Sequence, residues 1–528
     1  MQSGRATVRG PAGEAIYDVA VVGGGIAGMA TAARLQAAGL STIVCEAHGL
    51  PGGCAGYYRR AGFSFDVGAT TLVDFEPGGV GGELLEAIGL PPLDGKQLPG
   101  YVGWLPDRVV TLYRDPARWH AERLRVLGDT PAHRAFWQLM DELARVFWAA
   151  SRRGVTLPMQ NPGDAWRVVR SVGVGNLFLG RYLSSTIGRA LDSAGLREDR
   201  PLVGLLSMLV EDTVHSTVAE APLINAALGI TIRGAGLTRA HGGMRGFWRT
   251  FTRRYRQLGG ELRLACTVED IAGREGDFVL TTSRGTVRAA RLACAVPAEI
   301  AHRIGPPGVA AALAPFLRRD TDAHGGAVVV TLGVPEEEVM GQSFTHHQLL
   351  QRYDAPLGNG NNMFVSVSAP GDYESAPVGY RAVMISTHCE LGAWEGLTAD
   401  RYQQQKHALG EQLAGLARRV YPDLGRHAAV FDVGTPLTYA RYTRRPRGAV
   451  GGIRLTGRNA NQHAIPHELG VHGFWMVGDT TWPGLGTVAC VLGSRIVAAQ
   501  ILGQADPVAA RAPDRTRSPE IVGLASPG

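Results

Sequence analysis

Several features that define whole classes of protein are missing from this 528-residue sequence. No stretch reaches 18 uncharged apolar residues, so the sequence predicts no membrane-spanning helix. The first fifteen residues lack the apolar segment of a secretory signal, and we interpret residues 1–15 as a flexible leader. No internal repeat is visible, and the polar, proline-rich residues 505–528 are expected to form a disordered tail.

Cysteine is scarce and forms no metal or redox motif. The six cysteines contain no C-x-x-C pair: Cys45, Cys54, Cys266, Cys294, Cys389 and Cys490. Cys45, Cys266 and Cys294 lie in apolar runs typical of strands, which favours buried, reduced thiols. A cytoplasmic location is therefore the default expectation.

No catalytic constellation is recognisable either. The sequence lacks the G-x-S-x-G nucleophile elbow, and Pro466 lies between His463 and His467, so neither a hydrolase triad nor a zinc site is supported. His346 and His347 are adjacent and would point to opposite faces of a strand, and we interpret them as ordinary residues. The catalytic groups are therefore unknown at this stage, and no metal is expected.

The composition, 45% hydrophobic and 19% charged, is that of a globular protein, and the length predicts two domains. A net charge of +6 suggests an anionic partner. The arginines are spread out and do not interleave with aromatics, which argues against nucleic acid. A phosphate-bearing cofactor or an anionic membrane surface fits better.

The strongest local motif lies near the beginning of the chain. An apolar strand over Ile16 to Val22 leads into Gly23, Gly25 and Gly28, which complete G-x-G-x-x-G before a helix that Gly39 ends. A second buried strand then reaches Glu46, an acid placed to accept hydrogen bonds from a ribose. In this order the pattern predicts a bound adenine dinucleotide rather than a glycine-rich structural turn.

A second strand, glycine turn and helix occur near the end of the chain. Phe474 to Val477 is a short apolar run, followed by Gly478 and Asp479, a turn over residues 483–487 and an apolar helix from Val488 to Leu502. Such a helix start places backbone N–H groups toward an electron-rich ligand, and Asp479 could hold a hydroxyl. One extended dinucleotide held by both ends of the chain suits FAD better than NAD.

We therefore predict an α/β fold in which a discontinuous Rossmann-type FAD-binding domain is combined with a mixed α+β substrate domain. The FAD-binding domain is expected over residues 16–100, 241–300 and 431–504, and the substrate domain over residues 101–240, which face a membrane, and 301–430.

One apolar segment has two interpretations. Residues Val172 to Ile187 are flanked by Arg167, Arg170, Arg181 and Arg189. The segment could lie in a membrane interface with its arginines toward lipid headgroups. It could equally be a helix buried against the rest of its domain.

With these motifs in place, the chain resembles the phytoene desaturase and carotenoid isomerase family of flavoproteins, bacterial carotenoid desaturases above all. This family belongs to the wider amine-oxidase-like group that includes the Rab GDP-dissociation inhibitors. The matching segments occur in the family's order: VVGGGIAGMATAARLQAAG with Glu46, PGGCAG at 51–56, DVGAT at 66–70, HGGMRGFW at 241–248, TVEDI at 267–271, GTPLTYARYTRR at 434–445 and GFWMVGDTTWPGLGT at 473–487.

The resemblance implies a set of cofactor-binding residues. The ADP half would be held by Gly23, Gly25, Ile26, Ala27, Gly28, Glu46 and Ala47, and its adenine would be contacted by Val268. The flavin would be lined by Gly52, Gly53, Cys54, Ala55, Gly68, Ala69 and Thr70, and its pyrimidine edge would be faced by Gly486, Thr487 and Val488. The ribityl and phosphate groups would be bound by Gly478 and Asp479.

Two departures from the pattern matter. Cys54 stands where many relatives have an arginine, so one charge contact to the cofactor is in doubt. Amine oxidases usually place a lysine beside the flavin, but the only lysines here, Lys96 and Lys406, lie in no cofactor-like motif. This counts against amine oxidation.

The resemblance implies an FAD-dependent oxidoreductase that introduces double bonds into a carotenoid or related long isoprenoid by hydride transfer to flavin N5. A flavin-dependent cis-trans isomerase is the nearest alternative. A lipid carrier of the GDP-dissociation-inhibitor type is a third, which the intact motif at 478–488 argues against. Because no second G-x-G-x-x-G exists, quinone or oxygen is the expected electron acceptor, and peripheral contact with the cytoplasmic membrane face is expected.

Overall fold

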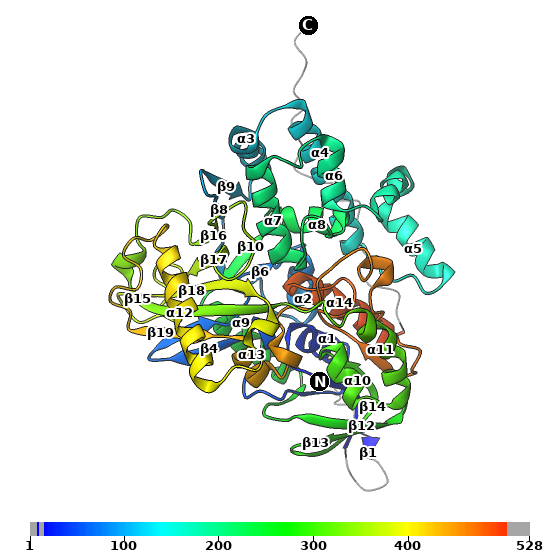
Figure 1. Ribbon diagram of the computed structural model, residues 1–528. Coiled ribbons are helices and arrows are strands. Elements are labelled where there is room, and N and C mark those ends of the chain that lie inside the picture. The colour runs from blue at the N-terminus through cyan, green and yellow to red at the C-terminus, as the bar shows by residue number, and fades with distance from the viewer. Residues whose placement is uncertain (1–7, 10–14, 504–528) are drawn as a thin grey trace.

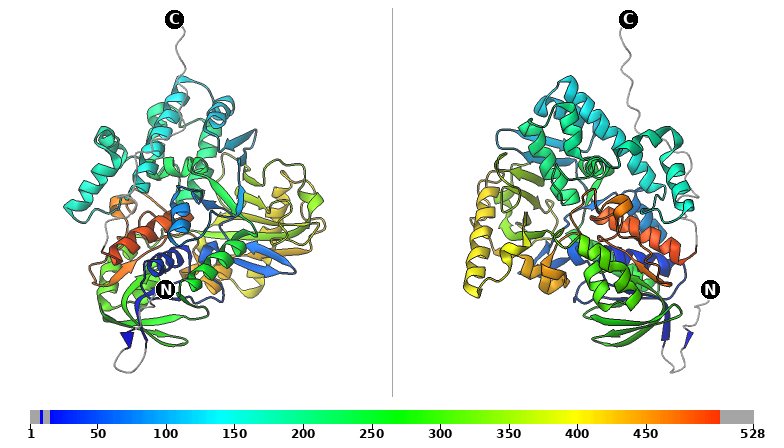
Figure 2. Two further views of the ribbon diagram at one scale, coloured as in Figure 1. Left: turned by 180° about the vertical axis from the view of Figure 1, so that it is seen from behind. Right: turned by 45° about the vertical axis from the view of Figure 1, so that its right-hand side comes forward.

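The computed structural model describes residues 8–9 and 15–503 of the chain. Two sheets face each other across the molecule, and a group of helices covers one end of both, at the top of Figures 1 and 2. The predicted leader lies outside the described residues except for Ala15 and β1 (Val8–Arg9), which pairs with β2. The predicted tail over 505–528 lies wholly outside them.

The first sheet joins segments from both ends of the chain. Its order is β11-β3-β2-β14-β13-β12, with β20 also paired to β14. Strands β2, β3, β11, β14 and β20 run parallel, whereas β12 and β13 are antiparallel additions. Their bounds are β2 (Ala15–Val22), β3 (Thr42–Cys45), β11 (Glu261–Arg263), β12 (Val268–Arg274), β13 (Asp277–Thr282), β14 (Gly285–Cys294) and β20 (Phe474–Met476).

Strand β2 shows why this sheet is buried on both faces. Val19 and Val21 pack in one apolar cluster with α1 (Ile26–Ala37) and α14 (Thr487–Ile501). Ala20 and Val22 point the other way, into a cluster with α10 (Ala298–Ile304) and α11 (Pro307–Arg319). Successive side chains of a strand alternate between faces, so an unbroken apolar run requires cover on both sides. The expected parallel, doubly covered sheet is confirmed.

The second sheet is mainly antiparallel, in the order β19-β15-β18-β17-β16-β8-β9. Val328 and Val330 of β15 pack against α12 (Ala399–Ala417), whereas Ala327 and Val329 lie on the opposite face, in a cluster with Met384 and Tyr439. The strands are β8 (Gly100–Trp104), β9 (Val109–Tyr113), β15 (Gly326–Pro335), β16 (His346–Leu350), β17 (Asn362–Val367), β18 (Tyr380–Cys389) and β19 (Val430–Gly434). One face of this sheet therefore remains available to a site between the sheets.

The helices over the top of the sheets begin with strong local signals. Asp115, Thr130, Asn161, Thr186 and Asp199 each accept a backbone N–H at a helix N-terminus. Proline follows four of these caps within two residues, where its missing N–H costs nothing. The helices are α3 (Pro116–Leu127), α4 (Pro131–Arg152), α5 (Pro162–Val172), α6 (Ile187–Ala194), α7 (Arg200–Val214) and α8 (Leu223–Ile230).

The segment with two interpretations is not a buried helix. Helix α5 ends at Val172, Gly173 has a φ of +84°, and a 3₁₀ helix, η2 (Val174–Tyr182), follows. Phe178 and Leu183 are each 50% exposed. The interpretation as a helix buried against its domain is therefore wrong, because Gly173 ends α5 and the 3₁₀ helix that follows leaves apolar side chains in solvent.

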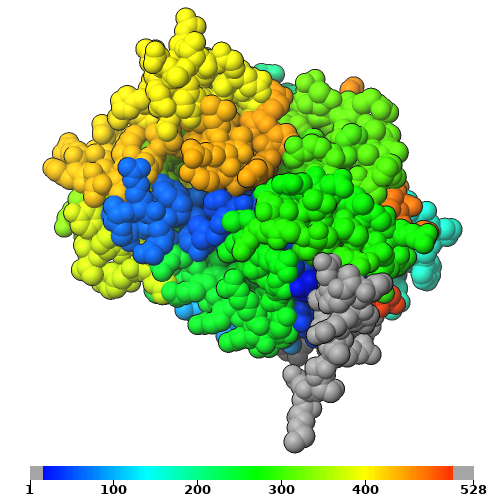
Figure 3. All heavy atoms as spheres, turned by 90° about the horizontal axis from the view of Figure 1, so that it is seen from below, coloured from blue at the N-terminus to red at the C-terminus, as the bar shows by residue number. Residues whose placement is uncertain are grey.

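Short elements connect the two sheets. Seen from below, residues near 60 (blue) lie beside residues near 440 (orange), and Arg60 of β4 forms an ion pair with Asp432 of β19 (Figure 3). Strand β10 pairs with both β6 and β7. The connecting elements are β4 (Tyr57–Arg60), β5 (Phe63–Asp66), β6 (Leu72–Val73), α2 (Val80–Ala87), β7 (Gly95–Gln97), β10 (Leu237–Ala240), α9 (Gly243–Gln257), α13 (Pro436–Thr443) and the 3₁₀ turns η1 (Gly53–Ala55), η3 (Ile232–Ala235), η4 (Glu336–Val339), η5 (Leu391–Trp394), η6 (Pro446–Gly448) and η7 (Asn461–His463).

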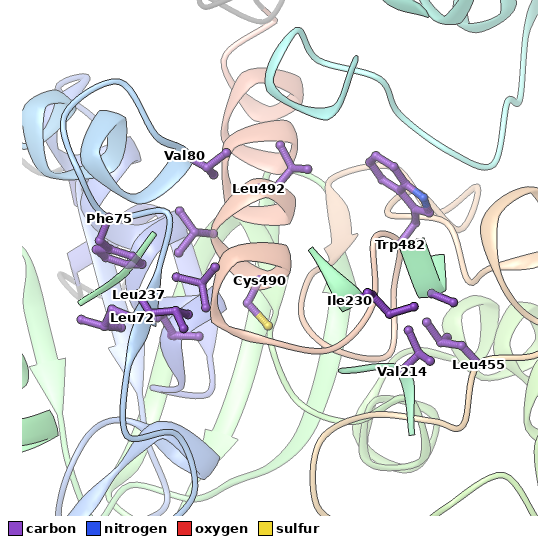
Figure 4. Packing of buried hydrophobic residues seen from close by; sticks show 14 of the residues in the cluster. Leu72, Phe75, Val80, Val214, Ile230, Leu237, Leu455, Trp482, Cys490 and Leu492 are labelled. Atoms are coloured by element: carbon purple, nitrogen blue, oxygen red, sulfur yellow. The ribbon is translucent and has the colours of Figure 1, made fainter. Parts of the chain in front are cut away.

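The last helix packs against the early part of the chain. In Figure 4, Val80 of α2 lies beside α14, the helix that carries Leu492, and Trp482 lies near Val214 and Leu455. These contacts belong to the largest apolar cluster of the described residues. The helix that follows the second glycine turn is thereby held beside the first sheet.

A buried ion pair ties three of these connecting elements together. Asp66 of β5 accepts a hydrogen bond from Arg239 of β10 at 2.8 Å and another from the backbone N–H of Met244 in α9, also at 2.8 Å. Both charged side chains are at least 94% buried. Removing one charge therefore leaves the other buried without compensation.

We expect Asp66→Asn to lower the free energy of unfolding by about 3–5 kcal/mol, because Arg239 loses its counter-charge in a dry environment. Urea denaturation followed by circular dichroism measures the change. The matched control is Asp354→Asn, which breaks the exposed Arg352–Asp354 pair and should leave stability nearly unchanged. Equal effects of the two substitutions would contradict this account.

Candidate functional site

A cavity of about 1350 Å³ lies between the two sheets. Pockets that enclose a drug-sized ligand are typically about 300–1,000 Å³, so this one has room for a larger ligand or for two. Its wall includes the end of β2, residues 295–297 after β14, and parts of β15 and β18. The site is therefore shared by both sheets.

The first glycine motif forms one end of the cavity. Gly23 has a φ of +101°, and a Cβ there would lie 2.9 Å from the carbonyl oxygen of Ala295. A Cβ on Gly28 would overlap the carbonyl oxygen of Gly23, so α1 can pack on β2 only with glycine at this position. Gly25 is different, because nothing lies within 4 Å of the position of its Cβ. The backbone at Gly25 is thus open to a ligand.

Glu46 is fixed at the end of β3. Its Oε2 accepts the Gly24 N–H at 2.6 Å, and its Oε1 accepts the His48 N–H at 2.7 Å. Burial raises the pKa of this carboxyl, although the two N–H donors oppose that shift. Glu46 therefore orients the loops on both sides of it and also lines the cavity.

The second glycine motif reaches the same cavity from the far end of the chain. The Cβ position of Gly478 lies 3.9 Å from the Cβ of Ala27, so β20 ends beside the start of α1. Asp479 forms an ion pair with Arg445, which the sequence did not single out. Burial opposes the charge on Arg445, but Asp479 outweighs it and holds the pKa of Arg445 above its usual range.

The middle segments complete this half of the wall. The N–H of Gly52 donates to the carbonyl oxygen of Gly24 at 2.9 Å, and Trp248 Nε1 donates to the carbonyl oxygen of Ala55 at 2.7 Å. Arg239 also donates to the carbonyl oxygen of Thr70 at 3.2 Å. These bonds hold the 52–55 and 68–70 turns beside the first motif.

Nearly all of the predicted cofactor residues therefore line one cavity. The exceptions are Gly28, which lies behind the motif between α1 and β2, and Val488, which packs against the apolar core. The residues that line it are Gly23, Gly25, Ile26, Ala27, Glu46, Ala47, Gly52, Gly53, Cys54, Ala55, Gly68, Ala69, Thr70, Val268, Gly478, Asp479, Gly486 and Thr487. Their individual roles remain predictions.

The cavity fits a phosphate-bridged dinucleotide. Helices α1 and α14 both begin at its wall after a glycine, and neither has a side-chain cap on its first N–H groups. Such helix N-termini bind anionic groups. The hydroxyl oxygen of Thr487 is buried and has no hydrogen-bond partner in the protein. A ligand lying between the two helix starts would satisfy these groups.

The other half of the cavity is lined by side chains that the sequence did not single out. The rings of Tyr101 and Phe364 contact each other at a tilt of 52° with their centroids 5.4 Å apart, and Ala327 and Val329 add aliphatic surface. Burial raises the pKa of Tyr101. This half suits an apolar ligand.

Ionisable side chains line this part of the cavity at more than one place, and Lys406 and Asp432 are among them. Asp212, His215, Arg233 and His388 also line the cavity. Asp212 lies on α7 and His215 directly follows that helix, a spacing that the sequence does show, but His388 comes from β18, far along the chain. Within residues 8–9 and 15–503, no group of three His, Cys, Asp or Glu side chains could hold a metal ion.

Comparison with known proteins agrees with this geometry. The family of NAD(P)-binding Rossmann-like domains matches residues 21–87. A chloroplastic prolycopene isomerase of Daucus carota is 23% identical over 90% of this chain and 78% of its own length. A lycopene-forming phytoene desaturase of Pantoea ananas is 43% identical, over 18% of this chain and 17% of its own.

Among solved structures, putrescine oxidase aligns with a TM-score of 0.59 at 18% identity, over 92% of this chain and 99% of that one. The amine-oxidase-like two-domain fold is thereby confirmed. The predicted resemblance to the phytoene desaturase and carotenoid isomerase family is also confirmed.

A pair of glycine substitutions separates ligand binding from folding. Gly25→Ala places a methyl group in open space at a φ of −69°, which alanine adopts freely, so the free energy of unfolding should not change. The methyl group blocks close approach of a dinucleotide, and affinity should fall at least about tenfold, or 1.4 kcal/mol.

Gly28→Ala should lower the free energy of unfolding rather than the affinity for dinucleotide, because its methyl group overlaps the Gly23 carbonyl. We expect a stability loss of about 1–3 kcal/mol or more. Urea denaturation of the ligand-free protein and equilibrium titration with dinucleotide measure the two effects. Loss of stability in Gly25→Ala would contradict the assignment.

Proposed function

We propose that this chain, an oxidoreductase of the carotenoid desaturase and isomerase group, binds FAD and introduces carbon–carbon double bonds into a carotenoid or related long isoprenoid. The observation that carries this proposal is the convergence of both ends of the chain on one cavity whose opposite wall includes Tyr101, Ala327, Val329 and Phe364. The names of the relatives, a prolycopene isomerase and a phytoene desaturase, support the choice of substrate class.

FAD fits better than NAD because the predicted contacts come from two distant motifs. The Rossmann-like match covers residues 21–87 and accounts for an ADP half near Gly25 and Glu46. The 478–487 segment lines the same cavity from the other side and would hold the second half of a longer ligand. A cofactor held at both ends by remote segments behaves as a bound prosthetic group.

When bound, the flavin supplies the hydride acceptor that no protein side chain provides. The residues of this chain would position the isoprenoid along the wall that Tyr101 of β8 and Val329 of β15 form, and would exclude water from it. Because only one G-x-G-x-x-G is present, we propose that electrons leave to quinone or oxygen rather than to a nicotinamide.

A flavin-dependent cis-trans isomerase is the second candidate. It is favoured by one observation, the match to prolycopene isomerase over 90% of this chain. A non-enzymatic lipid carrier is not supported, since the 478–487 segment lines the cavity and has unsatisfied groups for a ligand.

We further propose that the protein contacts the cytoplasmic membrane face. No described helix is long and apolar enough to cross a membrane. Trp166, Val174, Leu177, Phe178 and Leu183 nevertheless expose 42–77% of their surface around α5 and η2, and Arg167, Arg170, Arg181 and Arg189 are exposed beside them. Apolar side chains with basic neighbours suit an anionic interface, where a water-insoluble substrate is found.

The six free cysteines favour a reducing compartment.

The purified protein should carry bound flavin and be yellow. Incubated with a panel of carotenoid precursors, it should give products lighter by two hydrogens per new double bond, measured by mass and by a red-shifted absorbance. Products of unchanged mass would favour the isomerase. A colourless protein that takes up no added FAD would overturn the proposed function.

Membrane contact can be tested by sedimentation with anionic lipid vesicles. The double substitution Leu177→Ser and Phe178→Ser removes two exposed apolar groups without touching the core, and binding should fall about tenfold or more. The control is Val378→Ser, which removes another exposed apolar side chain, on the loop before β18. If both variants sediment like the parent protein, the contact lies elsewhere or does not exist.

A further inference from the structure

A group of titratable residues lies where α7, β18 and the 450s loop meet. His388 Nε2 is 3.5 Å from Asp212 Oδ1, and the His215 and His388 rings meet edge to face with centroids 5.1 Å apart. His215 Nδ1 is buried and has no hydrogen-bond partner. None of these residues belongs to the predicted cofactor motifs.

Amide side chains hold the two carboxylates of this group. Gln348 of β16 donates to Asp212 Oδ2, and Asn362 of β17 donates to Glu211 Oε2. The second sheet therefore fixes the orientation of both carboxylates, while leaving Asp212 Oδ1 facing His388. A histidine oriented by a carboxylate is a common arrangement for proton transfer.

His388 lines two cavities. It lines the large cavity together with Asp212 and His215, and it also lines a small pocket of about 50 Å³ whose other residues include Glu390 and Arg454. That volume is enough for water. The Glu390 side chain is 71% exposed, so the small pocket lies close to solvent. A proton accepted from the large cavity thus has a polar route out.

We propose that His388, oriented by Asp212, accepts the proton that a substrate carbon loses in this cavity. The inference rests on the proposed function. A C–H bond of the isoprenoid breaks, its electron pair becomes the new π bond, and the proton goes to the His388 imidazole and then to water in the small pocket. A bound flavin would supply the acceptor for the hydride, with its two electrons, that the neighbouring carbon loses.

The charges around His388 fit this role. Burial by itself lowers the pKa of His388, but Asp212 and Glu211 outweigh burial, and the pKa lies above its ordinary value of 6.5. Arg454 opposes that rise. Burial lowers the pKa of His215 to about 3 and raises that of Glu211, so His215 stays neutral and does not compete for the proton.

The proposed role of His388 fixes the direction in which turnover changes with pH. Only the neutral imidazole accepts a proton, so turnover should rise with pH through the pKa of His388, at a value above 6.5. In Asp212→Asn the imidazolium loses its nearest negative charge, so the pKa of His388 falls and the rising limb should move to lower pH.

The test compares His388→Gln, Asp212→Asn and the control His407→Gln, which alters an exposed histidine of α12. In His388→Gln we expect turnover to fall by about 10²-fold or more and the rising pH limb to disappear, with flavin content unchanged. Substrate recovered from D₂O should carry deuterium after incubation with the parent protein and with His407→Gln, but not with His388→Gln.

A second measurement is independent of turnover. In ¹⁵N-histidine NMR spectra, the resonance that disappears in His388→Gln should titrate above 6.5 in the parent protein and lower in Asp212→Asn. If the turnover limb does not move with this NMR pKa, or if His388→Gln keeps its rate, the inference is wrong. Should His388→Gln fail to fold, the Asp212→Asn comparison decides alone.

The two proposals fail in different ways. A parent protein that exchanges deuterium into a polyene without oxidising it contradicts the proposed desaturation and leaves His388 as the proton-transfer group. A flavin-containing protein that neither oxidises nor exchanges any polyene in the panel contradicts both.

Discussion

The parallel pairing of β14 with strands from both ends of the chain is the constraint on which the rest of the structure depends. Residues Leu292–Cys294 pair with Ala20–Val22 of β2 on one side and with Phe474–Met476 of β20 on the other. Parallel strands end at the same edge of a sheet, so the glycine turns after β2 and β20 open at one place. This pairing makes a single ligand able to contact Gly25 and Asp479, which are more than 400 residues apart.

Much of this half of the molecule could be predicted because its signals are local. An apolar strand, three glycines and a helix lie within a few residues, and the structure shows the reason for each glycine separately: Gly23 for its φ, Gly28 for close packing and Gly25 for open space. The 172–187 segment shows the limit of composition alone. Its apolar residues allowed either a membrane-interface segment or a buried helix, and Gly173, Gly175 and Gly180 were the better indicator against the buried helix, since three glycines in eight residues weaken an α-helix.

The charged group on the substrate side could not be predicted in the same way. Asp212 and His388 lie on different elements, and only the antiparallel order β18-β17-β16 and the packing of α7 bring them together. Adjacent His346 and His347 attract more notice in the sequence, yet both are fully buried. His346 stacks on Tyr101, His347 accepts a hydrogen bond from Trp104, and neither histidine lines the large cavity. Burial and partners, rather than residue type, separate these histidines from His388.

The neighbours of this group orient its carboxyl groups without supplying a positive charge. Gln348 and Asn362 are neutral donors to Asp212 and Glu211. Gly451 passes so close to His215 that a Cβ there would lie 2.6 Å from Cε1, and its φ of +71° also favours glycine. Burying charge costs free energy unless the geometry is well satisfied, and a hydrocarbon ligand offers no hydrogen bonds in return. A wall that only had to contact an isoprenoid would be more stable if it were apolar, so these residues are best explained by the proton that the reaction has to move.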